Sequence, residues 1–513
     1  MACGRGEIGR RSGLKIRFPE MGVRVQFPPS APCLQHAASL LAISLALAGC
    51  TAQRDDIPIT MSVIGTPLKL ADPRLLKTDA GGEVMLAATA QGLVSFDAEG
   101  RIAPGLAERW IVTDDGMSII FRIRRATWTD GRPVTARAVA DRLRAIMAPG
   151  SAHPFRPLLG GVEQVIAMTG QVIEIRMRAP QPELLQLLAQ PDMAIIREKA
   201  SQGTGPYRVH SVRAGVSRMR PIRDSSLEEP DSRVERDDIR ARGESAALAV
   251  ARFQARELSL VAGGTFGDLA LARAAKPASE QFQVDPAYGL FGLAVTDDSK
   301  ALTEASVRYA LAMSIDRERI VQSFGLSSWQ AQVAVLPTQL DSNSAPSALE
   351  WVYLDQAARI AKARGLIKGR IIGPIRIALP QNSGGRLLFA AIAADWRKIG
   401  VTAQSVAMTA PADLRLIDEV APNSAALWYL QRLSCAHGLP CDSVLETSLN
   451  AARTATTSKE RGDAIVEADS RLAQRQVFIP LALPLRWSLV SANLVGWRGN
   501  AFAVHPLMTL RSN

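Results

Sequence analysis

The chain has 513 residues, which is enough for two or three domains with large cores. Its composition, 47% hydrophobic and 21% charged residues, is that of a globular protein and excludes extensive disorder. The formal net charge of +11 comes from arginines spread along the chain and not clustered among aromatic residues, so we expect no nucleic-acid-binding surface.

Residues 1–49 are interpreted as a signal region. Ala37 to Ala48 form an apolar run of 12 residues, too short to span a membrane and suitable for the core of a secretory signal. The run ends in Leu47-Ala48-Gly49-Cys50, which resembles the bacterial lipobox, and a lipid on Cys50 would attach the mature chain to a membrane through two acyl chains. The alternative is an ordinary signal with a chance cysteine. Residues 1 to about 30 resemble neither a signal nor a folded element, so we expect an over-extended start.

The patterns of apolar residues, glycines and prolines predict a succession of strands and helices along the mature chain. The expected strands are 57–64, 119–123, 171–177, 258–261, 288–296, 375–379 and 401–408, and the expected helices are 83–90, 183–188, 246–255, 386–399 and 458–474. Strand 375–379, helix 386–399 and strand 401–408 are separated by short turns, the helix being closed by Gly400, and this predicts a parallel βαβ unit. Val477 to Pro484 is expected to return the chain to the part of the fold that the first half of the mature chain forms.

The stretch from Met117 to Met147 has the clearest local pattern. Ile119, Phe121 and Ile123 alternate with polar residues, turn residues follow, and Thr135 is placed to cap a helix. The stretch also resembles the signature of the family 5 solute-binding proteins of ABC importers, the peptide- and nickel-binding group, at Arg124, Trp128, Asp130, Gly131, Pro133, Val134, Thr135, Ala136 and Val139. Ala126 replaces the usual glycine of that signature, and Ala138 replaces its usual acidic residue.

Three further blocks resemble the same family and occur in the family's order. They are the segment ending in Pro104 to Trp110, the Gly203-Thr204-Gly205-Pro206-Tyr207 run, and Val307 to Glu318. The resemblance implies an α/β fold of the two-lobed periplasmic-binding-protein type, with mixed sheets, lobes discontinuous in sequence and a hinge. The expected divisions are 50–285 for lobe I with an inserted subdomain, 286–475 for lobe II, and 476–513 for the return to lobe I.

Cysteine usage points to one disulfide. Cys3 and Cys33 fall in the segment expected to be removed, and Cys50 is the predicted lipid carrier. Cys435 and Cys441 remain as an even pair in an exported and therefore oxidising compartment, which predicts a bond between them. A metal site with His437 between the two cysteines is the alternative, but nothing else in the sequence completes the ligand set.

No enzyme motif is present. The mature chain has four histidines, at 153, 210, 437 and 505, in no metal-ligand or triad spacing, and it lacks nucleophile-elbow, zinc-protease and nucleotide-binding motifs. We therefore expect no enzyme, no cofactor and no metal.

The resemblance directs attention to a pocket between the lobes. Peptide-binding members pair an aspartate of the second lobe with the peptide ammonium, but the corresponding region, Ala426 to Cys435, has no acid and offers Trp428, Tyr429 and Arg432. Arg386 lies roughly where dipeptide-binding members place an arginine for the peptide carboxylate; a solvated arginine is the alternative. Thr78 and Asp79 belong to a loop expected to form the first-lobe wall.

These observations predict a lipid-anchored receptor, in the periplasm or at the cell surface of a bacterium, that captures a peptide or peptide-like solute by hinge closure. Its expected partners are that solute, an inner-membrane ABC permease and the membrane itself, and we expect a monomer. The alternative is a protein of the same fold that acts as a chaperone or partner-recognition module without transport.

Overall fold

The structure is a computed structural model that describes residues 58–75, 78–197, 203–222, 238–297, 299–338, 340, 346–347 and 349–512. All of the described residues belong to one compact unit. The predicted signal region and the lipid carrier Cys50 lie outside the described residues.

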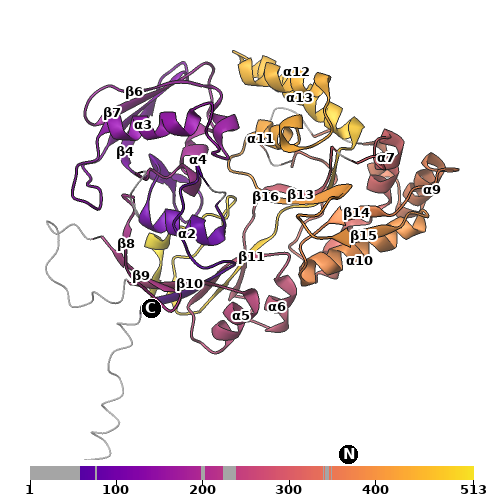
Figure 1. The fold of residues 1–513 in the computed structure, drawn as a ribbon, viewed down its shortest axis with the longest axis horizontal. Helices are drawn as coiled ribbons and strands as arrows, with labels where there is room; N and C mark the ends of the chain where they lie inside the picture. The colour runs from indigo at the N-terminus through magenta and orange to yellow at the C-terminus, as the bar shows by residue number, and fades with distance from the viewer. Residues whose placement is uncertain are drawn as a thin grey trace, which may run out of the picture. The chain divides into compact units, whose positions relative to one another are not determined.

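A seven-stranded mixed sheet forms one layer of the fold (Figure 1). In sheet order its strands are β12 (Phe282–Val284), β18 (Arg486–Val490), β11 (Leu260–Thr265), β1 (Ile59–Ile64), β10 (Ile239–Glu244), β9 (Val216–Pro221) and β8 (Tyr207–Arg213). The central strand β1 runs parallel to both β10 and β11, and its apolar side chains Ile59, Met61 and Val63 are buried. Helix α5 (Ala246–Gln254) packs against β1 and β11, and α6 (Leu269–Ala274) packs beside α5.

The stretch that is most clearly patterned in the sequence forms a small antiparallel sheet covered by a helix. The sheet order is β4 (Ala107–Val112), β5 (Ser118–Ile123), β7 (Val172–Met177) and β6 (Val162–Ala167). Ile119, Phe121 and Ile123 of β5 are all buried, and α3 (Ala136–Met147) packs on the sheet. Thr135 caps α3 by accepting a hydrogen bond from the backbone N–H of Ala138 at 3.2 Å. The predicted strand, turn and capped helix are therefore confirmed.

Short elements join these two sheets. They are α2 (Ala80–Thr89), the hairpin of β2 (Val94–Phe96) and β3 (Ile102–Pro104), α4 (Leu184–Leu188), and the 3-10 turns η2 (Arg156–Leu159) and η3 (Pro191–Met193). Gly205 lies directly against the end of α2, since a Cβ there would come within 2.4 Å of the Ala90 nitrogen. This close approach explains why the chain needs a glycine in that turn. We call all of these elements, together with the seven- and four-stranded sheets, lobe I.

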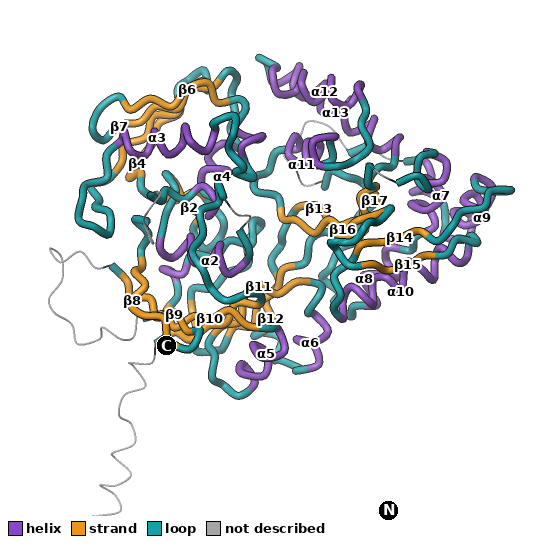
Figure 2. Tube along the Cα trace, viewed as in Figure 1, coloured by secondary structure: helices purple, strands orange, loops and turns teal. Residues whose placement is uncertain are grey.

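Lobe II is built on a five-stranded mixed sheet, seen on the right of Figures 1 and 2. Its order is β15 (Ala403–Val406), β14 (Ile375–Ala378), β16 (Leu414–Val420), β13 (Gly289–Val295) and β17 (Phe478–Ala482). The surrounding helices are α7 (Ala305–Ser314), α8 (Arg317–Ser323), α9 (Gln356–Leu366), α10 (Ser383–Lys398), α11 (Ala426–Arg432), α12 (Ser443–Thr454) and α13 (Ser458–Arg475), with the 3-10 turns η4 (Glu350–Tyr353) and η5 (Cys435–His437).

The predicted βαβ unit is present in lobe II. Strands β14 and β15 run parallel and are joined by α10, which ends before Gly400 in a left-handed conformation with φ +81°. The helix begins three residues earlier than expected, at Ser383, because the Asn382 side chain accepts a hydrogen bond from the Gly385 N–H at 2.9 Å and caps it there.

The chain passes between the lobes twice, from β12 to β13 and from β17 to β18. The segment 477–484, expected to return the chain to lobe I, differs from that expectation because β17 pairs with β13 at the edge of the lobe II sheet. The return comes only after Ala482, and β18 then joins the lobe I sheet beside β11. The chain ends with β19 (Leu494–Val495), η6 (Leu507–Thr509) and β20 (Arg511–Ser512).

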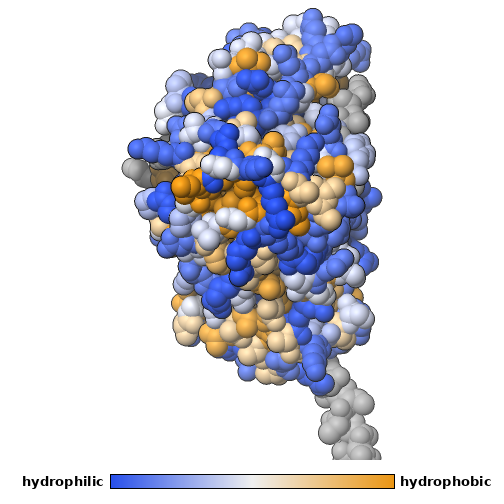
Figure 3. Space-filling view, turned by 90° about the vertical axis from the view of Figure 1, so that its right-hand side faces the viewer, coloured by the Kyte–Doolittle hydropathy of each residue, from blue (hydrophilic) through white to orange (hydrophobic). Residues whose placement is uncertain are grey.

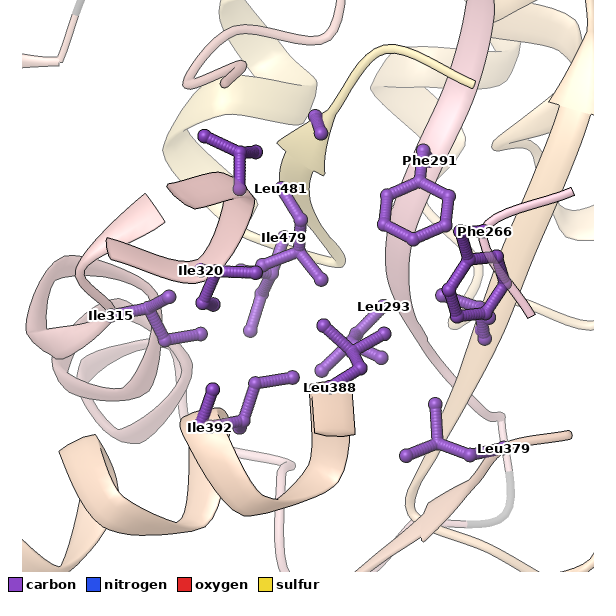
Figure 4. Packing of buried hydrophobic residues seen from close by; sticks show 14 of the residues in the cluster. Phe266, Phe291, Leu293, Ile315, Ile320, Leu379, Leu388, Ile392, Ile479 and Leu481 are labelled. Carbon is purple, nitrogen blue, oxygen red and sulfur yellow. The ribbon is translucent and has the colours of Figure 1, made fainter. Parts of the chain in front are cut away.

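One hydrophobic core extends from the lobe II sheet toward the crossing segments (Figure 4). Phe266, which follows β11 of lobe I, meets Phe291 of β13 edge to face, with ring centroids 4.9 Å apart. Such aromatic pairs contribute about 0.5–1.5 kcal/mol beyond their buried area. The contact therefore stabilises the packing of lobe I on lobe II beside the crossing segments.

Hydrophobic residues also gather on the lobe II face that Figure 3 shows, among hydrophilic side chains. Tyr353 and Ile371, which flank α9 in sequence, are the most exposed large hydrophobic side chains, at 81% and 102%. None of the described helices is both long and apolar enough to cross a membrane.

Candidate binding cleft

A cavity of about 500 Å³ lies between the two lobes. Lobe I lines it with residues of the α2 region, of the segment before η2, of η3 and of the C-terminal segment, and lobe II lines it with the end of β16, one face of α11 and η5. The lining residues are Thr78, Glu83, Pro154, Phe155, Pro157, Leu158, Gln190, Asp192, Asp418, Glu419, Val420, Ala421, Pro422, Trp428, Gln431, Arg432, His437, Arg486, Phe502, Ala503 and Val504. A solute in this cleft would touch both lobes at once.

Two ion pairs form the charged part of the cleft. Arg486 of β18 donates from Nη1 to Oδ1 of Asp418 at 2.8 Å and from Nη2 to the Asp418 carbonyl oxygen at 3.2 Å. Arg432 of α11 donates to both carboxylate oxygens of Glu419, at 2.7 and 2.8 Å. The first pair joins the sheets of the two lobes, since β18 belongs to lobe I and β16 to lobe II. The second lies within lobe II.

The lobe I wall is organised around Asp192. Thr78 donates a hydrogen bond from Oγ1 to Oδ1 of Asp192, and Nε2 of His153 lies 2.9 Å from the Asp192 carbonyl oxygen. Burial lowers the pKa of His153 below its ordinary value, and the nearby Asp192 only partly offsets that effect. His153 is therefore mostly neutral near neutral pH and fixes the wall through a hydrogen bond instead of a charge.

A disulfide joins Cys435 and Cys441 on the lobe II side, with their Cα atoms 4.8 Å apart. The loop that it closes contains His437, which lines the cleft. Burial, and then the nearby Arg432, lower the pKa of His437. The metal alternative for these three residues is not supported, because both sulfurs are bonded to each other, and the described residues contain no cluster of three or more potential metal ligands.

The lobes also touch directly beside the cleft. Gln190 donates from Nε2 to the Pro422 carbonyl oxygen at 2.7 Å, and Oε1 of Gln186 accepts from the N–H and hydroxyl of Ser424, at 2.8 and 3.0 Å. Arg461 of α13 pairs with Glu183 of lobe I. These contacts connect α4 and its surroundings to lobe II.

The residues that the sequence proposed for the site fall into two groups. Thr78, Trp428 and Arg432 line the cleft. Tyr429 does not, because it is fully buried beneath Trp428 with the two ring centroids 4.8 Å apart, and burial raises its pKa. Of the polar atoms near the cleft, Oε1 of Gln431 is buried and without a hydrogen-bond partner among the described residues.

Asp79 and Arg386 also lie outside the residues that line the cleft. Asp79 caps α2 by accepting a hydrogen bond from the Gly82 N–H at 2.8 Å, and it also accepts one from the Thr66 hydroxyl. Arg386 is exposed in the first turn of α10. The capping role explains an aspartate at position 79 without any ligand.

Sequence reasoning missed several residues of the cleft. Asp418 and Glu419 come from the end of β16. This strand precedes the segment 426–435, which corresponds to the region where peptide-binding members carry their ammonium-pairing aspartate. An acidic pair at the end of an apolar strand was the available signal. Gln190 and Arg486 have no local signal, because only the packing of the two lobes brings them to the cleft.

Trp128 and Tyr207, which belong to the blocks that resemble the family, both lie in cores. Trp128 is 6% exposed among the side chains under α3, and Tyr207 is 3% exposed. The Tyr207 hydroxyl donates a hydrogen bond to the Leu507 carbonyl oxygen at 3.3 Å.

Comparisons with known proteins agree with this architecture. The chain is 29% identical over 127 residues to the probable deoxycholate-binding periplasmic protein YgiS of Escherichia coli, 23% of this chain and 24% of that protein. It is 22% identical over 369 residues to the oligopeptide-binding protein OppA of Bacillus subtilis, 64% of this chain and 66% of that protein. The chain thus spans less than two thirds of the length of either relative.

A solved structure shares the fold over nearly the whole chain. The complex of Haemophilus influenzae OppA with the peptide RPPGFSPFR superposes with a TM-score of 0.77, covering 90% of this chain and 100% of that one at 17% identity. That protein has the two-lobed periplasmic-binding fold, and this chain shares it.

The family model for the middle part of the bacterial extracellular solute-binding proteins, family 5, matches residues 101–419, more than half of the chain. The members of this family bind solutes and are not enzymes. The chain therefore belongs to the family 5 bacterial extracellular solute-binding proteins of ABC importers.

Proposed function

We propose that the protein captures a peptide or peptide-like solute in the cleft between its lobes and presents it to an ABC permease. The observation that carries the proposal is a cleft of about 500 Å³ lined by both lobes, within the range of sites that hold small molecules. A solute that contacts both lobes binds the closed arrangement more tightly than the open one, and therefore shifts the hinge toward closure.

The chemistry of the cleft suits a peptide. The carboxylates of Glu83, Asp192, Asp418 and Glu419 line it and can accept hydrogen bonds from a solute with an ammonium group. The names of the Bacillus and Haemophilus relatives, which bind oligopeptides, support the same solute class.

The location follows from the relatives and from the sequence. The Escherichia coli relative is periplasmic by name, and the lipobox-like segment ending in Cys50 supports a lipid anchor on a bacterial membrane. We infer a monomer that works beside its permease, in the periplasm or at the cell surface.

Native mass spectrometry of the protein purified from its own periplasm tests the solute class. The expected result is a co-purifying peptide that dissociates on unfolding. If no peptide co-purifies and neither peptides nor a library of small solutes raise the melting temperature, the transport proposal fails. The alternative of a chaperone or partner-recognition module then takes its place.

Trp428→Ala tests the cleft itself. Because Trp428 offers an aromatic surface in the cleft, its removal should weaken binding of the identified solute by about 10-fold to 100-fold. Arg397→Ala, an exposed position in the last turn of α10, is the matched control and should bind as the parent does. If Arg386 binds the solute, as proposed from the sequence, Arg386→Ala should weaken binding. Because Arg386 lies outside the residues that line the cleft, we expect the affinity of this variant to be unchanged.

A further inference from the structure

Lobe I contains a second and larger cavity, of about 960 Å³. It lies between the four-stranded sheet, the β2–β3 hairpin, the turn at Gly205 and the C-terminal segment. Glu83, in the first turn of α2, lines the cleft, whereas Leu86, Ala87 and Ala90, toward the other end of the helix, line the cavity. The two spaces are therefore neighbours along α2, and Gln190 and Val504 line both of them.

The charged side chains of this cavity have one sign. Arg124, Arg125 and Arg208 line it, and no aspartate or glutamate is present among its described lining residues. None of the three arginines forms an ion pair in the part of the chain that the structure describes, whereas both arginines of the cleft do. Partial burial lowers the pKa of Arg124 and of Arg208. Three cations without a counter-charge favour an anion.

Two of these arginines are held on one wall by a short hydrogen-bond network. Arg124, just after β5, donates from Nη2 to Oε1 of Gln91 at 2.9 Å. Gln91 in turn donates from Nε2 to the carbonyl oxygen and hydroxyl of Thr204, at 2.6 and 3.0 Å. Arg208 donates from Nη1 to the carbonyl oxygens of Gly205 and Tyr207, both at 3.3 Å.

The turn that carries this network is fixed to the end of α2. The backbone N–H groups of Gly203 and Gly205 donate to the Thr89 carbonyl oxygen, at 2.9 and 3.1 Å. Backbone carbonyl oxygens therefore position the guanidinium group of Arg208, and the Gln91 side chain positions that of Arg124. Each guanidinium keeps N–H donors that these bonds do not use. Donors that are fixed in place lose little conformational entropy when they bind an anion.

The rest of the wall is largely apolar. Leu86 and Ala87 of α2, Val94 and Phe96 of β2, and Leu507 of η6 supply hydrophobic surface. A ligand that fits both parts carries a negative group at one end and an apolar body at the other. A small inorganic anion would leave this surface unused, and a neutral hydrocarbon would leave the arginines without a counter-charge.

We propose that the lobe I cavity is a second binding site, for an amphipathic carboxylate such as a medium-chain fatty acid. The carboxylate accepts hydrogen bonds from Arg124 and Arg208, and the chain packs along α2 and β2. The site is separate from solute capture in the cleft, so either proposal can fail while the other stands.

Calorimetric titration of the purified protein with decanoate, below the concentration at which it forms micelles, tests the proposal. One decanoate should bind per protein, whereas decanol and decyltrimethylammonium, which share its chain length, should bind at least about 10-fold more weakly because they lack the anion. Equal binding of decanol, tighter binding of the cation, or several decanoates per protein would each overturn the proposal.

Variants locate the site. Arg124→Gln and Arg208→Gln should each weaken decanoate binding by about 10-fold to 100-fold, because each removes a charge-assisted hydrogen bond. Arg213→Gln is the matched control, since Arg213 is exposed on the same strand as Arg208 and does not line the cavity. Unchanged affinity in both cavity variants, or an equal loss in the control, contradicts the assignment.

Two further variants test the location of the site without altering its arginines. Ala87→Phe places a larger side chain in the apolar part of the cavity without altering an arginine, and it should also weaken decanoate binding. Trp428→Ala alters the cleft and should leave decanoate binding unchanged. If Trp428→Ala instead abolishes it, decanoate occupies the cleft and the lobe I site is refuted.

Discussion

The cleft between the lobes meets the first turn of α2, the cavity inside lobe I meets the other end of that helix, and the two spaces differ in how their charges are compensated. In the cleft, Arg486 and Arg432 are each bonded to a carboxylate of β16. In the cavity, Arg124 and Arg208 bond to an amide side chain and to carbonyl oxygens, and neither has a carboxylate partner among the described residues. Arginine therefore serves the structure in the cleft and is left available in the cavity.

The difference teaches which arginines the fold depends on. An arginine paired with a partly buried carboxylate cannot be removed without leaving that carboxylate uncompensated. An arginine that faces no carboxylate in the described chain contributes little to the free energy of unfolding, so its removal should leave the fold almost as stable as before. The variants below are ordered from the largest expected effect to the smallest, and each one strengthens or breaks this distinction.

Arg486→Ala should have the largest effect. It leaves the Asp418 carboxylate, whose side chain is 16% exposed, without its partner and removes the ion pair that joins the two lobe sheets. We expect the free energy of unfolding to fall by about 2–3 kcal/mol, measured by urea denaturation. The double variant with Asp418→Ala should lose less than the sum of the single variants, because the second substitution removes the uncompensated charge. Strict additivity would show that the pair does not stabilise the fold.

Replacing both Cys435 and Cys441 by serine should have the second-largest effect on stability. The disulfide closes a loop with a sequence separation of 6, and its loss should lower the free energy of unfolding by about 2 kcal/mol on the chain-entropy estimate. Solute affinity should fall with it, since the same loop holds His437 against the cleft. Decanoate binding in lobe I should be unchanged, and a parallel loss of both would show that the two sites are not independent.

Arg208→Gln should change stability by less than about 0.5 kcal/mol, measured by thermal unfolding, because no carboxylate is left unpaired. This variant is the counterpart, in the lobe I cavity, of Arg486→Ala in the cleft. A loss as large as that of Arg486→Ala would mean that Arg208 serves the fold, and the comparison between the two regions would then fail.

Local patterns in the sequence predicted the elements that depend on neighbouring residues. The alternation of β5, the Thr135 cap of α3 and the parallel pairing of β14 with β15 are all set by residues close together in the chain. The start of α10 was misplaced because its cap, Asn382, lies before the apolar pattern begins. The lobe to which segment 477–484 belongs depends on which sheet its strand joins, and no local pattern in the sequence carries that information.

The same reasoning explains the outcome for the candidate site. Trp428, Gln431 and Arg432 of α11 line the cleft, and their spacing of three and four residues places them on one face of the helix. Tyr429 lies about 100° further around a helix of 3.6 residues per turn, so it enters the core. Helical spacing places Tyr429 at the edge of that face, three residues from Arg432, and the packing of the lobe II core decides that its ring is buried. Asp418 and Arg486 are 68 residues apart, and only the packing of the lobes brings them together.

The smallest expected effect concerns pH. The folded-state pKa of His437 is below its ordinary value of 6.5, chiefly because of burial, so the unfolded chain takes up a proton that the folded chain resists. The stability tied to His437 is thus fully present above about pH 6.5 and is lost as the pH falls below it. The pKa of His153 is also lowered by burial, and it affects stability in the same direction. His437→Gln should therefore flatten the decline in the free energy of unfolding, measured by denaturation from pH 7.5 to about 5.5, without abolishing it. An unchanged decline would refute the role of burial.

The described lining of the lobe I cavity has no group that titrates between about pH 6.5 and 8. Decanoate affinity should therefore stay constant over that range, and a pH-dependent affinity would show that a titrating group outside this lining reaches the arginines.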